Sequence, residues 1–201
     1  ALYVADPINL TASFTYPATS LVSYLFQRVP GQFYEWQCLA GLDILFLACI
    51  APAAAMPRKN WAGAVLVFAA GFLLPFFFSV VPAGTPSTIY ANAMADTPLA
   101  LLFGGTLCLY AAAGGRKTGF FACAMPLAVL TMTKDIGFAY ALIVTFLIGL
   151  DQLFGTPHPD TKPARIFGVS LAKCSILAAV VLAVFISWNR YTAAVTPTET
   201  T

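Results

Sequence analysis

The chain has 201 residues, of which 60% are hydrophobic and only 9% are charged. Soluble domains carry roughly 25% charged residues, so this composition excludes an ordinary soluble enzyme and is typical of a membrane protein with several apolar spans. The net charge of +2 results from ten basic and eight acidic residues, and pairs of basic residues such as Arg58 with Lys59 lie at the ends of apolar runs. Such pairs form no patch that would bind nucleic acid.

The first 34 residues are polar and aromatic, and Pro7, Pro17 and Pro30 interrupt them. Within this segment, apolar residues recur at helical spacing over Ser20–Arg28. They predict a short amphipathic helix lying at the membrane interface, although a plain surface helix would show the same pattern. The chain begins at Ala1 without an initiator Met, a signal peptide or a basic leader, so we expect a fragment of a longer protein.

Six apolar runs follow this segment. They predict an all-α fold, a polytopic membrane helix bundle of about six transmembrane helices with the N-terminal interfacial helix beside it. The third and fourth runs are short for a bilayer. We predict an extracytoplasmic segment over 1–34, a transmembrane domain over 35–190 and a polar tail over 191–201. The expected spans are about 36–56, 61–81, 97–114, 119–132, 136–154 and 166–188.

The distribution of basic residues predicts the orientation of these spans, because cytoplasmic loops are enriched in Lys and Arg. With strict alternation, only Arg28, Lys134 and Arg190 fall outside. The N-terminal segment, the 83–97 loop and the joint at Lys134 and Asp135 then share the extracytoplasmic face. The basic residues predicted to lie on the cytoplasmic side are Arg58, Lys59, Arg116, Lys117, Lys162, Arg165 and Lys173.

Three charged residues on that face have two readings each. Asp96 precedes Thr97 and Pro98, an ordinary helix start, so it either caps a helix or contacts a hydroxylated substrate or a metal. Asp135 either caps the helix of the fifth span or contacts the substrate together with Asp96. Lys134 either extends its ammonium to the lipid headgroups or pairs with a lipid phosphate.

Three other charged residues lie within or near the ends of spans. Asp43 sits inside the first span, where a carboxylate normally faces the bundle interior, so we expect it to be hydrogen-bonded to a tyrosine or a serine. Asp151 is expected to be solvated at the cytoplasmic end of the fifth span. Lys173 is expected to extend toward the cytoplasmic surface, and no role is assigned to it.

Candidate metal ligands are few. The five cysteines form no CxxC motif, His158 is the single histidine, and no phosphate-cradling glycine loop, HExxH or GxSxG is present. The sequence therefore predicts no metal site and no cofactor, although a divalent ion beside Asp96 stays open.

Three stretches, taken in order, resemble bacterial membrane glycosyltransferases of the GT-C superfamily. Tyr16–Phe26 is similar to the aromatic-proline segment that ends their first large external loop. Tyr90–Gly104 resembles a later external loop that enters a span with an aspartate at the boundary. Leu130–Ala139 looks like their lysine-bearing joint. The order and spacing fit across roughly residues 16 to 150.

This resemblance implies transfer of a sugar from a polyprenyl-phosphate donor to an acceptor at the outer face of a bacterial inner membrane, with inversion. The partners implied are the lipid-linked sugar and membrane lipid. Asp96 and Asp135 would be the catalytic carboxylates. Lys134 would bind the leaving phosphate with Arg28 as a second candidate, and Tyr16 and Tyr90 would contact substrate. The family's usual base lies early in its first external loop, so we expect that base upstream of Ala1.

Two other functions remain open from the residues. Asp43, together with Pro75 and Pro126, could belong to broken helices around the midplane site of a transporter or flippase. The chain could also be a non-catalytic membrane subunit. The sequence does not specify an oligomeric state, a sugar or an acceptor.

Overall fold

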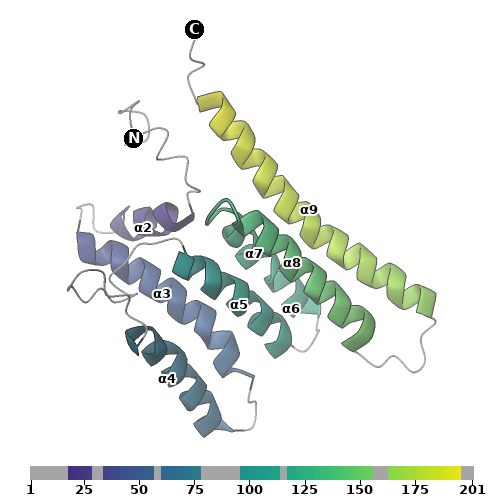
Figure 1. Ribbon diagram of the computed structural model, residues 1–201, viewed down its shortest axis with the longest axis horizontal. Coiled ribbons are helices and arrows are strands. Elements are labelled where there is room, and N and C mark those ends of the chain that lie inside the picture. The colour runs from purple at the N-terminus through teal and green to yellow at the C-terminus, as the bar shows by residue number, and fades with distance from the viewer. Residues whose placement is uncertain are drawn as a thin grey trace.

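The computed structural model describes residues 18–28, 34–56, 60–77, 96–113, 117–155 and 163–195. Within these ranges the chain forms helices and turns and no strand, which confirms the all-α prediction for this part of the chain (Figure 1). The helices are α2 (Ala18–Arg28), α3 (Glu35–Ala54), α4 (Trp61–Phe77), α5 (Asp96–Ala112), α6 (Lys117–Ala122), α7 (Ala124–Thr131), α8 (Gly137–Leu150), the π-helix η2 (Asp151–Gly155) and α9 (Pro163–Val195).

The apolar helices run side by side in alternating directions, with α6 and α7 together making one pass (Figure 1). At one end of the bundle lie α2, the starts of α3 and α5, and the joint between α7 and α8. We call this the α2 end. At the other end lie η2 and the starts of α4, α6 and α9. We call this the η2 end.

The core is formed where α5, α6, α7, α8 and α9 meet. On the other side of α5, α3 packs against α2, α4 and α5. Small residues allow this close approach, since a Cβ at Gly105 of α5 would lie 2.9 Å from the backbone oxygen of Cys49 on α3. The buried core side chains are Leu99, Leu102, Tyr110, Phe120, Cys123, Leu127, Leu130, Ala141, Val144, Ile148, Leu177 and Val181.

Two helical segments are long and apolar enough to cross a membrane, Gly137–Phe154 and Phe167–Ala194. This is fewer than the six expected from the sequence. The other apolar helices in the described part of the chain are shorter, and they cover Leu39–Ala54, Trp61–Leu73, Asp96–Ala112 and Gly119–Thr131.

Two of the expected spans differ in detail. The fourth is divided at Cys123 into α6 and α7, near Pro126, which has no N–H to donate to the preceding turn. The sixth is longer than expected, because α9 continues to Val195, five residues into the predicted polar tail. No proline or glycine lies between Trp188 and Pro197, and a proline disfavours helical geometry in the residue before it.

The N-terminal helix predicted over Ser20–Arg28 is present as α2 and begins slightly earlier. It packs on α3, where the Phe26 ring lies so close to Gly41 that a Cβ there would be 2.6 Å from Cδ2 of that ring. Leu21, Tyr24 and Leu25 stay exposed. The helix therefore has one face on the bundle and one apolar face free.

Candidate functional site

The α7–α8 joint is a tight turn whose backbone polar groups are paired locally. After α7 ends, the Thr133 N–H donates to the Leu130 carbonyl at 3.2 Å, and the Gly137 N–H donates to the Lys134 carbonyl at 2.8 Å. The Thr133 hydroxyl donates to the carbonyl of Val129 at 2.8 Å. Because the joint satisfies its own hydrogen bonds, it holds a fixed shape without a long loop.

Glycine at position 137 makes this turn sterically feasible. A Cβ there would lie 2.1 Å from the backbone oxygen of Leu130, and real Cβ atoms do not approach a backbone oxygen so closely. The first residue of α8 therefore lies directly against the last turn of α7. This contact sets where Lys134 and Asp135 project.

Lys134 forms an ion pair with Asp96, and the ammonium nitrogen Nζ donates to Oδ1 of the carboxylate. Asp96 is the first residue of α5, where a negative charge also interacts favourably with the helix dipole. Both side chains stay open to solvent, 45% exposed for Lys134 and 68% for Asp96. Two residues that lie 38 positions apart are thus brought together at the α2 end.

The other candidate residues at this end do not join the pair. Asp135 and Arg28 are exposed, and among the described residues the single ion pair is that of Lys134 with Asp96. Tyr16 and Tyr90, which the resemblance named as substrate contacts, lie outside the described residues.

The start of α2 also meets the joint. The Ala18 N–H donates to the carbonyl of Met132 at 3.0 Å, and the Ala18 side chain is buried. A helix about a hundred residues earlier in the chain is thereby fixed beside Lys134. The sequence predicted that both segments lie on one face of the membrane, and only the fold shows that they touch.

A second polar cluster lies at the η2 end, and we call it the η2 network. The Tyr110 hydroxyl of α5 donates to Oδ2 of Asp151 at 2.8 Å. It accepts from Nε2 of Gln152 at 2.6 Å. Oε1 of Gln152 accepts from Nζ of Lys173 on α9 at 2.8 Å, and that ammonium also lies 5.8 Å from the centre of the Phe120 ring. Four segments are linked in this way.

The η2 network corrects two expectations from the sequence. Asp151 is exposed, as expected for a solvated residue, but it also accepts a hydrogen bond from Tyr110. Lys173 does not simply extend toward the surface, because it is half-buried and donates to Gln152. Gln152 and Tyr110 are both buried and were not singled out. Their signal in the sequence was a glutamine and a tyrosine within apolar runs, where each needs a partner.

Asp43 is half-buried on α3, as expected for a carboxylate that faces the bundle. Its Oδ1 atom is buried and has no hydrogen-bond partner among the described residues, so the expected tyrosine or serine partner is not found for this atom there. Ile50 lies seven residues after Asp43, on the same face of α3. The Ile50 side chain packs against Gly71 of α4.

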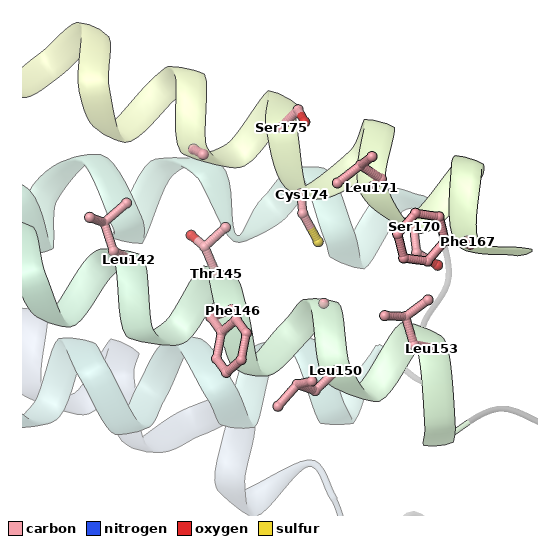
Figure 2. Close-up of a pocket in the computed structure, with 12 residues that line it drawn as sticks. Leu142, Thr145, Phe146, Leu150, Leu153, Phe167, Ser170, Leu171, Cys174 and Ser175 are labelled. Carbon is pink, nitrogen blue, oxygen red and sulfur yellow. The ribbon is translucent and has the colours of Figure 1, made fainter.

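The groove between α8 and α9 differs in character from both polar clusters. It has a volume of about 380 Å³ and lies along the η2 half of the two helices (Figure 2). Its walls are mainly apolar and include Phe146, Leu153 and Phe167, with no charged side chain. Its polar lining consists of the hydroxyls of Thr145, Ser170 and Ser175 and the thiol of Cys174, so the groove has no carboxylate, ammonium or guanidinium group.

The described residues contain no cluster of three or more His, Cys, Asp or Glu side chains that could hold a metal ion. No protein-family model, no curated protein and no solved structure matches the chain. The resemblance to GT-C glycosyltransferases therefore stays a prediction from the sequence.

Proposed function

We propose that the chain is part of a multi-pass membrane glycosyltransferase of a bacterial inner membrane. It would transfer a sugar from a polyprenyl-phosphate donor at the extracytoplasmic face. One observation carries this proposal, the Asp96–Lys134 ion pair, which sets a cation and a carboxylate side by side on the exposed α2 end. Lipid-linked transfer needs these two groups, a cation for the leaving phosphate and a carboxylate for the acceptor hydroxyl.

The six-pass topology is part of the proposal. The alternating directions of the apolar helices support it, as do the two segments long enough to cross a membrane (Figure 1). The shorter helices would cross where the bilayer thins around the protein. With the basic pairs on the cytoplasmic side, the α2 end would face outward.

The proposed chemistry uses the two side chains in different ways. The acceptor oxygen forms a bond to the anomeric carbon of the sugar, while the bond from that carbon to the phosphate oxygen breaks. The acceptor proton passes to the Asp96 carboxylate, which here takes the role of the base that the resemblance puts upstream of Ala1, and the bonding electrons leave with the polyprenyl phosphate. Lys134 stabilises the negative charge on that leaving group, so the donor phosphate replaces Asp96 as its partner. The displaced carboxylate is then free to accept the proton.

The test measures sugar transfer and lipid-phosphate binding on the same full-length protein in lipid nanodiscs. Lys134→Ala should weaken binding and abolish transfer, and Lys134→Arg should keep part of both. Asp96→Asn should abolish transfer and keep binding, since it removes the competitor for the ammonium. Full transfer by Lys134→Ala would sink the proposal.

Asp135 is the second carboxylate at this end, and the same assay decides between the two. Asp135→Asn should keep transfer if Asp96 is the base. If Asp135→Asn abolishes transfer while Asp96→Asn does not, the roles are reversed. Loss in neither variant would indicate a base on another segment of the protein.

One observation favours a second candidate function, a transporter. The unpartnered buried oxygen of Asp43 is a carboxylate atom within an apolar helix, and such atoms often mark ion or substrate pathways. Substrate uptake into proteoliposomes that is lost in Asp43→Asn and kept in Lys134→Ala would favour transport over glycosyl transfer.

A further inference from the structure

The outer half of α9 lies beside the α7–α8 joint, which carries Lys134. This helix of 33 residues is about 50 Å long and projects past the joint at the α2 end (Figure 1). It lies beyond the stretch of residues 16 to 150 that carries the resemblance. A role for α9 therefore follows only from the packing.

A groove lies between this part of α9 and the joint. Its volume is about 340 Å³, and its wall from the joint is Met132, two residues before Lys134. The other lining residues all come from α9, and they are Ala183, Val184, Ser187 and Trp188. The groove is thus mainly apolar and lies against the joint that carries Lys134.

One aromatic contact joins α9 to α8 at this level, and a second lies within α9. The Phe185 ring stacks on Phe138 of α8, with ring centres 4.2 Å apart. Trp188 stacks on Tyr191 at 5.5 Å, one turn further along α9. Trp and Tyr are enriched where a membrane helix meets the headgroup layer, so these rings are typical of the boundary between hydrocarbon and headgroups.

The charges near the groove are complementary to an anionic headgroup. Lys134 lies on the joint, and Arg190 lies two residues beyond Trp188, about 3 Å further along the axis of α9. Arg190 is exposed and shares a side of α9 with Ala183, which is seven residues earlier. An apolar groove with cations at its outer end fits a molecule that has a phosphate head and a hydrocarbon chain.

We propose that this groove holds the first part of the hydrocarbon chain of a lipid phosphate whose head is bound at Lys134, with Arg190 as a second contact for the phosphate. This inference rests on the function proposed above. It adds α9 as the wall that orients the lipid, so that the bond between the phosphate and the sugar faces Asp96. The hydrocarbon chain of the lipid moves from the bilayer into an equally apolar groove, so the transfer itself provides no hydrophobic driving force. Shape and packing must therefore supply the selectivity.

The experiment uses a prenyl phosphate with a diazirine in its first isoprene unit, photolysed with the full chain in lipid nanodiscs. Labelled peptides are mapped by mass spectrometry. We expect label on Met132 and on residues 183–188, and loss of that label when unlabelled prenyl phosphate is added in excess. Arg190→Ala should reduce the label several-fold.

Two alanines of α9 make a matched pair of variants. Ala183 lines the groove, and Ala179, one turn earlier, is exposed and is not part of its lining. Ala183→Phe should remove most of the α9 label, since the ring fills the groove, whereas Ala179→Phe should leave it unchanged. Equal effects of the two variants would overturn the groove assignment.

The outcomes separate this inference from the proposed function. Label that depends on Lys134 but spreads over the exposed faces of several helices, α4 included, would overturn the groove and keep the phosphate site. Label that is unchanged in Lys134→Ala and not displaced by unlabelled prenyl phosphate would overturn both.

Discussion

The two ends of the bundle use charged side chains in opposite ways. At the α2 end, Lys134 and Asp96 pair directly, and both side chains remain open to solvent. At the η2 end, Lys173 reaches Asp151 only through Gln152 and Tyr110, and these two intermediates are buried. An exposed pair can exchange its partner for a ligand at little cost, whereas a buried chain of hydrogen bonds cannot.

This difference indicates that the η2 network stabilises the fold, whereas the Asp96–Lys134 pair is available for chemistry. The η2 network joins α5, η2 and α9, so its energy contributes to the packing of helices. The α2 end obtains its rigidity from the backbone of the joint and from the contact of Ala18 with Met132, so the charges themselves are left free for chemistry. Four predictions test this division, from the largest expected effect to the smallest.

The largest effect is expected at the joint. Gly137→Ala should lower the free energy of unfolding by about 3 kcal/mol, because the new methyl group meets the Leu130 backbone oxygen. Gly104 is a helical glycine with nothing within 4 Å of its Cβ position. Gly104→Ala should therefore be neutral or stabilise by up to ~1 kcal/mol. Denaturant unfolding in detergent micelles measures both, and equal stabilities would contradict the tight turn.

A smaller loss is expected when the η2 network is cut at its centre. Gln152→Leu should cost about 2 kcal/mol, since it leaves the Lys173 ammonium without its side-chain acceptor. Adding Lys173→Met removes that stranded charge, so the double variant should be more stable than Gln152→Leu alone. A double-mutant cycle measures the coupling, and strictly additive losses would show that the two side chains do not interact.

A still smaller loss is expected from Tyr110→Phe, which keeps the ring and removes one hydroxyl. The expected cost is about 1 kcal/mol, because the hydroxyl makes two hydrogen bonds. Tyr140 is the matched control, since its ring contacts Phe103 and its hydroxyl makes no hydrogen bond within the described residues. Tyr140→Phe should change the unfolding free energy by less than Tyr110→Phe under the same conditions.

The smallest change in stability is expected from Asp96→Asn. An exposed ion pair contributes roughly 0.5 kcal/mol, and salt screens it further. Unfolding at low and high salt should show a small loss that fades as salt is added, while the loss in Gln152→Leu persists. A cost for Asp96→Asn as large as that for Gln152→Leu would break the distinction between the two ends.

Much of the architecture could be read from the order of apolar runs. They predicted the helical class, and the amphipathic pattern over Ser20–Arg28 predicted α2, although two of the helical segments rather than six are long and apolar enough to cross a membrane. Asp96 and Lys134 were both singled out as candidate residues on one face, and the structure joins them. The length of α9 and the break at Cys123 were missed, because they depend on where a helix finds a partner or a proline rather than on hydropathy alone.

The sequence by itself determined the helical class and the residues at the ends of the helices, since apolar periodicity and helix-start signals act locally. Only the tertiary structure decided which of these residues meet. The Asp96–Lys134 pair, the contact of Ala18 with Met132 and the chain from Lys173 to Asp151 each join segments more than 20 positions apart. Such contacts depend on how helices pack side by side, and the close approaches at Gly105 and Gly137 set that packing.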